Sequence, residues 1–562
     1  MHHRMEPTSP PFDLAKTGHA FTTIFSSYKQ KGLKPSEEEL HKWVDEMDTR
    51  GVWKHIGHRD LVMFLYYLSY FDHRPPPIFI LNWFHHATPM LGYFRAKDLS
   101  LSMYCMAKLQ LRKTPALESF VQTWIHYAYV KLHTFNCQDL SNSLYGINKL
   151  RIVSMPAVQT FLQEWFLVAM KRLPFFQSKE LSCSMLSLSQ LNIGPAFPYR
   201  NAFVEWWIHI AFPQLRYFNQ RSLVASLFAL AHLPPSPFPA VSYEYLVHCT
   251  TEKMDDTFDS QSLMDILFSF MKFQKTLPPP LLRKSLTKWF SIATTALDRF
   301  TTDHLVYAIS NLYFVEDPNV YDRYLEQWMS VIKPRIQQLS AKRLFHCGLS
   351  LSKLSSSILL DLEFVELWLE CVSEHLQSEY AITTSIYCLS KLRLPSSSSF
   401  LDRFIQDHWL PAAIDHVSQC TPSQLANIIW SLGHVRPHAS PEHQQQFLEV
   451  WFETTTKSLS QFNVLDLSNA IYGITRLVSI IPSSFVEVWL QVALPKLSLF
   501  NASNLAYSLS GISKIEIPPM SLMTRFLQKW VQYASRFTFI DHEIMVIRDA
   551  LKQMKIAAKF CS

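Results

Sequence analysis

Tryptophan recurs in this sequence at one period, and that period restricts the fold more than any other feature. Twelve of the 15 tryptophans follow one another at 38 to 42 residues, or at 82 residues in one place, which is twice the period. The series runs through Trp43, Trp83, Trp124, Trp165, Trp207, Trp289, Trp328, Trp368, Trp409, Trp451, Trp489 and Trp530, with His248 near the empty position. A period of about 41 residues is typical of chains built from stacked copies of one small unit.

Two helices are predicted in each period. Segments such as FVQTW and FVEVW end in these tryptophans, and the aromatic residue four positions earlier shares a helical face with the Trp. We name this predicted segment helix A. About 16 residues later a leucine, the anchor, opens an amphipathic pattern that predicts helix B, as in residues 139–150 and 466–477. Prolines such as Pro115 and Pro156 separate helix B from the next helix A.

The predicted fold is all-α: a right-handed α-solenoid of about thirteen helical-hairpin repeats. One hairpin cannot bury its apolar faces alone, whereas stacked hairpins share a continuous core. We expect an N-terminal cap at residues 1–35, tandem repeats at 36–540 and a C-terminal cap at 541–562. Only 11 of 562 residues are glycine, too few for folds that depend on Gly-rich phosphate loops or tight β-turns.

A row of basic residues recurs nine positions after the anchor of helix B. It consists of Lys108, Lys149, His232, Lys272, Lys353, Lys391, His434, Arg476 and Lys514. Cations in this position could bind phosphate groups. They could also complement the dipole at the end of helix B, an effect of about 0.3–1 kcal/mol for each residue. The sequence leaves both interpretations open.

A second position, two residues after the anchor, varies in identity and is often polar. It includes Asn142, Asp265, Tyr307, His346, Thr384, Asn427, Asn469 and Tyr507. This position precedes the basic one by seven residues, so the two lie within about 20° of each other on the helix. These side chains are candidates for reading base edges, and the alternative is a solvated surface that is free to vary.

Three other positions have two interpretations each. The residue before the anchor, such as Asp139, is read mainly as a helix-capping residue. The small residue six positions after the anchor, such as Gly473, would permit close approach of either a nucleobase or a neighbouring helix. The aromatic residue five positions after it, such as Trp430, could stack on a base, but such a stripe more often belongs to the core. The tryptophans of helix A are expected in the core.

The text LANIIWSLGHV at residues 425–435 resembles the signature helix of octotricopeptide repeat proteins, and DLSNSLYGINKL and DLSNAIYGITRL are similar variants. Related hairpin repeats occur in FAST-kinase-like and heptatricopeptide proteins. The resemblance extends over nearly the whole chain. It implies a sequence-specific binder of single-stranded RNA that reads about one nucleotide per repeat and affects RNA maturation, stability or translation. In that case the nine basic residues bind phosphates and the eight varied residues read bases.

The main alternative is a protein–protein interaction scaffold of the HEAT or TPR kind, which needs no regular row of cations. The sequence contains no HExxH, GxSxG or GK[ST] motif, so we predict no catalytic residues, no metal site and no cofactor. Nine cysteines without a CxxC pair indicate a reducing compartment. Without a long apolar run or a clear targeting segment, we expect a monomer that is soluble in the cytoplasm or an organelle, with no membrane contact and with protein partners as a further possibility.

Overall fold

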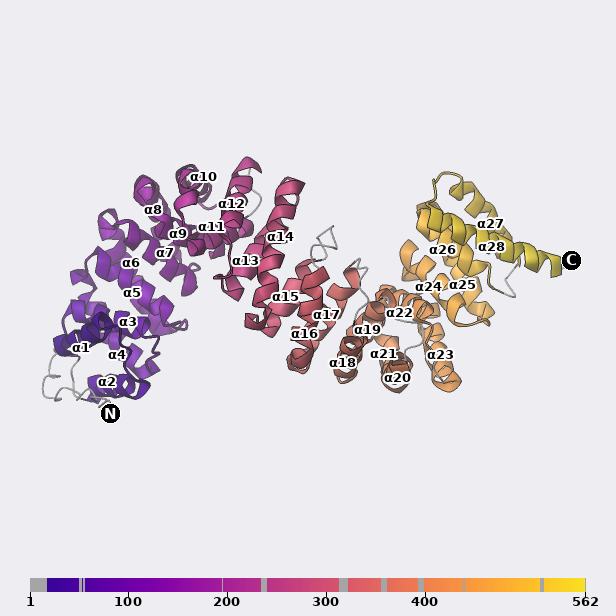
Figure 1. Ribbon diagram of the computed structural model, residues 1–562, viewed down its shortest axis with the longest axis horizontal. Coiled ribbons are helices and arrows are strands. Elements are labelled where there is room, and N and C mark those ends of the chain that lie inside the picture. Colours follow the sequence, from indigo (N-terminus) through magenta and orange to yellow (C-terminus); the bar gives the residue numbers. More distant parts are fainter. Residues whose placement is uncertain are drawn as a thin grey trace. The chain divides into compact units, whose positions relative to one another are not determined.

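The computed structural model of the protein describes residues 18–49, 53, 56–194, 196–233, 240–312, 322–354, 361–392, 399–437, 440–515 and 520–560. In these residues the regular structure is helical throughout and contains no strand, which confirms the all-α prediction (Figure 1). The chain divides into two compact units, Met1–Trp289 and Phe290–Ser562. Each unit is described by itself.

The first unit alternates between the two predicted kinds of helix after an opening helix, α1 (Gly18–Gln30). Its A helices are α2 (Glu37–Thr49), α4 (Pro77–Ala87), α6 (Pro115–Lys131), α8 (Pro156–Arg172), α10 (Arg200–Ala211), α12 (Ala240–Lys253) and α14 (Pro279–Ala296), the last of which ends in the second unit. Its B helices are α3 (His58–Tyr70), α5 (Ala96–Lys108), α7 (Cys137–Lys149), α9 (Ser178–Gln190), α11 (Gln220–His232) and α13 (Ser260–Phe273).

The second unit continues the alternation. Its A helices are α16 (Asp322–Ile332), α18 (Leu362–Ser373), α20 (Ser399–Phe404) with its continuation through a wider turn into α21 (Leu410–His416), α23 (Pro441–Ser458), α25 (Ser483–Lys496) and α27 (Met520–Ala534). Its B helices are α15 (Thr302–Leu312), α17 (Ala341–Lys353), α19 (Glu379–Lys391), α22 (Pro422–Val435), α24 (Val464–Leu477), α26 (Ala502–Ile512) and α28 (Asp541–Phe560). In each unit, successive B helices pack directly on one another and form one layer.

The sequence places the helix starts through proline and capping residues. Pro115 occupies the first turn of α6, where its missing N–H costs nothing, and the Thr114 hydroxyl accepts a hydrogen bond from the Leu117 amide at 3.3 Å. In α7 the Asp139 amide donates to the Asn136 side chain at 2.9 Å, and the Asn136 amide donates to the Asp139 carboxylate at 3.1 Å. The acid before the anchor is therefore a capping residue, as predicted.

Eleven of the twelve tryptophans of the series lie in the core, whereas Trp43 of α2 is only half-buried. Each of the eleven donates its indole N–H to the same backbone oxygen. The acceptor is the carbonyl of the anchor residue in the preceding helix B, at 2.7 to 3.1 Å. The pairs include Trp124 with Leu99 and Trp451 with Leu425. The residue three positions after the anchor is often serine, such as Ser143 and Ser508, and its small side chain leaves room for the indole.

A second recurrent bond joins several A helices, among them α6, α12 and α25, to the turn before the preceding helix B. Lys131 at the end of α6 donates to the carbonyl oxygens of Gly92 and Phe94 at 2.7 and 2.6 Å. Lys496 at the end of α25 donates to the Phe462 carbonyl at 2.6 Å. These cations hold turns in place and are separate from the basic row on helix B.

The helix A that lacks a tryptophan, α12, keeps the same packing with a smaller side chain. Leu246 and Val247 are fully buried, whereas the neighbouring His248 is exposed. Lys253 donates to the Phe218 carbonyl, as Lys131 does to that of Phe94. The empty position of the tryptophan series is therefore filled by an aliphatic residue and not by the histidine.

The small residues on helix B lie between adjacent B helices. A Cβ atom added to Gly473 of α24 would lie 2.5 Å from the Ile429 carbonyl oxygen of α22, and one added to Gly511 of α26 would lie 2.8 Å from that of Ile471. Backbone meets backbone at these positions, so a side chain is excluded. Of the two interpretations of the small residue, helix packing is the one that the structure supports.

We predict that Gly473→Ala lowers the free energy of unfolding by about 1–3 kcal/mol, because the added methyl group forces α22 and α24 apart. Helix propensity alone predicts the opposite sign, a gain of up to about 1 kcal/mol. Urea unfolding of the two proteins decides between these effects. Gly194→Ala, where a Cβ atom meets nothing within 4 Å, is the matched control. A Gly473→Ala protein as stable as the parent would contradict the close packing.

Candidate nucleic-acid interface

One strip of each helix B stays outside the helix packing. It carries the residues two, five and nine positions after the anchor, which are half-buried or exposed in most repeats. The anchor itself and the residues three, four and six positions after it face helix A or the neighbouring helix B. The strip therefore holds the basic row and most of the predicted base-reading residues.

In the second unit the strip is a chain of aromatic rings and cations from α19 to α24. The Lys391 ammonium lies 4.3 Å from the centre of the Trp430 ring, and the His434 ring lies 3.9 Å from that ring. His434 is in turn 5.8 Å from Tyr472. The Arg476 guanidinium lies 5.1 Å from the centre of the Tyr472 ring. The chain extends to α26, since the Tyr472 and Tyr507 rings are 4.8 Å apart.

The cations of this strip have no carboxylate partner within the described ranges. No ion pair involves Lys391, His434, Arg476 or Lys514. Burial lowers the pKa of Lys391, and burial together with Arg476 and Arg436 lowers the pKa of Lys514. Burial also lowers the pKa of His434, and the neighbouring cations Arg476, Lys391 and Arg436 lower it further. Among the described residues, positive charge is therefore concentrated here without a compensating carboxylate, and a bound anion would relieve it.

The interpretation of the basic row as helix-end cations holds for some of its members. Arg476 donates to the Gly433 carbonyl in the last turn of α22 at 2.9 Å and to the Tyr472 hydroxyl at 2.8 Å. The His232 ring lies 2.9 Å from a carbonyl oxygen of its own helix, and the His434 ring lies 2.8 Å from a carbonyl oxygen of its own. The ammonium groups of Lys391 and Lys514 make no such bond in the part of the chain that the structure describes. The helix dipole therefore explains part of the row and leaves the ammonium groups of Lys391 and Lys514 available.

The first unit repeats the arrangement on a smaller scale. The Phe228 and Phe268 rings of α11 and α13 are 5.6 Å apart, and the Lys272 ammonium lies 5.4 Å from the centre of the Phe268 ring. His232 lies 4.7 Å from the same ring. Lys108 and Lys149 are exposed at the ends of α5 and α7, and Lys149 donates to Gln190 at 3.2 Å. Lys353 in the second unit is exposed at the end of α17.

The aromatic residues five positions after the anchor were predicted to belong mostly to the core, and this is wrong for most of them. Tyr104, Tyr145, Tyr387 and Trp430 are half-buried, and their rings contact neighbours on the same strip. Tyr472 alone among these contacts is buried, at 6% exposure. The reason is that the fifth position points away from helix A, whose tryptophan fills the opposite side of helix B.

Most predicted base-reading residues lie on the strip, and one does not. The half-buried ones are Asn142, Asp265, Tyr307, Asn427, Asn469 and Tyr507, and His346 is exposed. Thr384 is buried at 6% exposure, so it cannot reach a ligand, and the prediction for this residue is wrong. Burial raises the pKa of Asp265, while a hydrogen bond from Gln261 at 2.8 Å opposes the shift.

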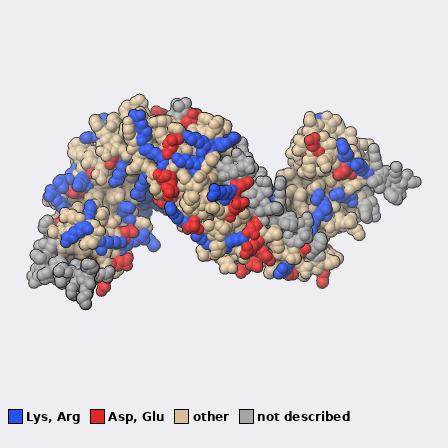
Figure 2. All heavy atoms as spheres, in the orientation of Figure 1, with Lys and Arg blue, Asp and Glu red and all other residues tan. Residues whose placement is uncertain are grey.

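The sequence reasoning missed Arg436. It ends α22 in a left-handed conformation, with φ of 49°, two residues beyond the basic row, and contributes to the low pKa of His434. Arg151 follows α7 in the same position with φ of 54°. Aligning the repeats eleven residues after the anchor would have revealed both. On the face shown in Figure 2, Lys and Arg side chains gather over α24, while acidic ones gather near α18, a helix A.

Two other kinds of site are absent from the described part of the chain. No group of three or more His, Cys, Asp or Glu side chains there is placed to hold a metal ion. None of the described helices combines the length and the apolar character needed to cross a bilayer.

Comparison with known proteins adds no family. No family model matches the chain, and no curated protein matches it. Among known structures, a chain of the "Homology model of the full-length AP-3 complex in an intermediate open conformation" is similar, with 11% identity and a TM-score of 0.30 over 96% of this chain and 90% of that one. At this TM-score the likeness carries no argument about function.

We predict that His434 makes the fold less stable in mild acid. Because its pKa is lowered in the folded protein, the unfolded chain binds the proton more readily, and the free energy of unfolding falls as the pH drops below about 6.5. His73 and His86 also have lowered pKa values and add to this fall. The His434→Gln protein should therefore lose less stability than the parent between pH 7.5 and 5.5 in urea unfolding. His248→Gln, a change of an exposed side chain, is the control. Equal losses in parent and His434→Gln protein would refute the prediction.

Proposed function

We propose that this protein binds single-stranded RNA along the strip of helix B, with about one nucleotide for each of about thirteen repeats of a right-handed solenoid. The observation that carries the proposal is the series of contacts between rings and cations from Lys391 to Tyr507, in which no cation has a carboxylate partner among the described residues. The resemblance of residues 425–435 to an octotricopeptide helix supports the same function. That helix is α22, which carries Trp430 and His434 in the middle of this series of rings and cations.

Single-stranded RNA suits this surface for two physical reasons. Half-buried rings such as Trp430 offer stacking partners to unpaired bases, at about 1–3 kcal/mol for each base. Cations such as Lys391 next to those rings would meet the phosphates between the bases. A folded-protein partner would need no such alternation of ring and cation.

Base selection is assigned to the residues two positions after the anchor. Asn427 and Asn469 stand at this position in α22 and α24, half-buried beside the aromatic chain. An amide side chain can donate and accept at once and so can pair with a base edge. Thr384 is excluded from this role by its burial.

We predict that the Lys391→Gln, Lys514→Gln double variant binds RNA more weakly and with less dependence on salt. Removing two phosphate contacts should reduce the slope of log K against log salt by about 1.4, at about 0.7 for each contact with a single strand. Their ammonium groups make no hydrogen bond to the backbone of the described residues, so the fold should be retained. Filter binding to a pool of random RNA from 50 to 300 mM salt measures the slope.

The matched control for charge is Lys457→Gln. This lysine lies on helix A, in α23, and pairs with Glu453 at 2.7 Å. It should leave both affinity and slope unchanged. If the double variant keeps the parent slope, or if no RNA binds while a protein partner is retained, the protein is an interaction scaffold and the proposal fails.

We predict that Asn469→Asp changes the base preference at one nucleotide only. The carboxylate keeps the shape of the side chain and loses its two N–H donors, so a base that needs a donor is disfavoured by about 1–3 kcal/mol. RNA selected from random pools by the parent and by the variant should differ at a single position. A uniform loss across all sequences would show that Asn469 does not read a base.

A further inference from the structure

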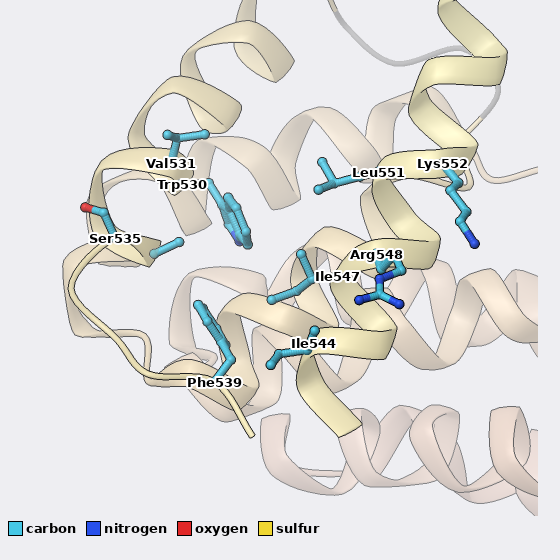
Figure 3. Close-up of a pocket in the computed structure, with 10 residues that line it drawn as sticks. Trp530, Val531, Ser535, Phe539, Ile544, Ile547, Arg548, Leu551 and Lys552 are labelled. Atoms are coloured by element: carbon cyan, nitrogen blue, oxygen red, sulfur yellow. The ribbon is translucent and has the colours of Figure 1, made fainter. Parts of the chain in front are cut away.

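Among the described hairpins, α27 with α28 carries an apolar groove at a place that the next helix A covers in the earlier ones. The groove has a volume of about 630 Å³. Figure 3 shows Trp530 of α27, Phe539 of the connecting turn, and Ile544 and Ile547 of α28 around it. Arg548 and Lys552 stand on α28 at one side of the groove.

Hydrogen bonds fix the register of α28 against the other B helices. The Glu543 carboxylate accepts hydrogen bonds from the Ile540 amide at 3.0 Å and from the Ser503 hydroxyl of α26. Asp139 of α7 does the same with the Asn136 amide and the Ser100 hydroxyl of α5. Glu543 is thus the residue before the anchor, and Ile544 is the anchor of α28.

The exposure of this anchor is exceptional. Anchors of the earlier B helices, from α3 to α26, are at most 1% exposed: Leu61, Leu99, Leu140, Leu181, Leu223, Leu263, Leu305, Leu344, Ile382, Leu425, Leu467 and Leu505. Ile544 is 41% exposed. Val531, the residue after the tryptophan of α27, is 63% exposed, whereas Phe166 and Leu490 in the same position are fully buried. In those hairpins the next helix A covers both positions.

The earlier interfaces also define what fits the groove. The tryptophan of one helix A contacts the aromatic residue that lies four positions before the tryptophan of the next helix A, with ring centres 5.2 to 5.9 Å apart. The next tryptophan donates to the anchor carbonyl, as Trp530 does to Leu505 at 2.9 Å. A helix with an aromatic residue and a tryptophan four positions later would therefore place the aromatic ring against Trp530. Its indole N–H would donate a hydrogen bond to the Ile544 carbonyl.

The third residue after this anchor, Ile547, does not prevent such binding. Ile266 of α13 and Ile428 of α22 stand in the same position. The indoles that follow them, Trp289 and Trp451, still reach their anchor carbonyls at 2.7 and 3.1 Å.

We propose that this groove, the C-terminal groove, binds an amphipathic helix of a partner protein that carries an aromatic–x–x–x–Trp pair and acidic residues beside it. Arg548 and Lys552 have no carboxylate partner in the described residues and would attract the acidic side. The first helix A of a second copy is not free to serve, because Trp43 of α2 already packs against Phe25 of α1, with ring centres 4.7 Å apart. The proposal continues an interface that recurs through the chain and does not depend on RNA binding.

A peptide with the sequence of α25, Ser483–Lys496, tests the proposal, because it contains the pair Phe485 and Trp489 with Glu487 between them. Fluorescence anisotropy of the labelled peptide with the full chain should show saturable binding. The same peptide with Trp489→Ala should bind at least about tenfold more weakly, since the central aromatic residue dominates such contacts. The Ile544→Asp protein should lose binding by a similar factor.

Ile480→Asp, which alters a residue 83% exposed in the turn before α25, should bind the peptide as the parent does. Unfolding curves of the parent and Ile544→Asp show that the variant is folded under the conditions of the binding assay. Absence of saturable binding, or equal binding by Ile544→Asp, overturns the proposal. So does a dimer of the parent that Ile544→Asp abolishes, since the occupant would then be a second copy. RNA binding by Ile544→Asp should equal that of the parent, so the two proposals fail separately.

Discussion

The hydrogen bond from the tryptophan indole of helix A to the anchor carbonyl of the preceding helix B is the interaction on which this fold depends. A buried indole N–H without an acceptor would cost about 1–3 kcal/mol, and the anchor carbonyl offers its second lone pair. Eleven such bonds of 2.7 to 3.1 Å repeat through the chain. Each bond fixes how helix A lies on the previous hairpin. The spacing of the tryptophans in the sequence therefore sets the spacing of the hairpins in the structure.

That constraint also decides which side of helix B remains available. Helix A and its tryptophan occupy one side, and the close backbone contact at residues such as Gly473 occupies the side toward the next helix B. What is left is a narrow strip, and the chain places aromatic and basic residues there. Trp430 and Lys391 meet on this strip although 39 positions separate them in sequence. The proposed RNA interface is thus the side of helix B that neither helix A nor the next helix B covers.

Cations have two distinct uses in this structure. Lys131 and Lys496 end an A helix and bind turn carbonyls, so their charges serve the architecture. Lys391 ends a B helix and Lys514 follows one, and their ammonium groups bind no carbonyl among the described residues. Burial lowers the pKa of both, and Arg476 and Arg436 lower that of Lys514 further. Arg476 combines both uses, since it bonds to Gly433 and also faces the ring of Tyr472. The second group, and not the first, has a reason to bind anions.

The sequence by itself determined the helices, their alternation and the burial of most of the tryptophans. Capping residues fix the ends of each helix locally, and the period of about 41 residues gives each hairpin nearly the same neighbours. It also placed the basic row and most of the varied residues on one side of helix B, since their spacing of seven residues fixes their angle on a helix. It could not separate Thr384, which is buried, from Asn469, which is not, nor show that Tyr104 and Trp430 lie on the surface. Only the tertiary structure decided these points, because the side of helix B that meets water depends on how helix A and the next helix B cover it. The same is true of Ile544, an anchor like twelve others in sequence, which is exposed because no described helix covers α28 there.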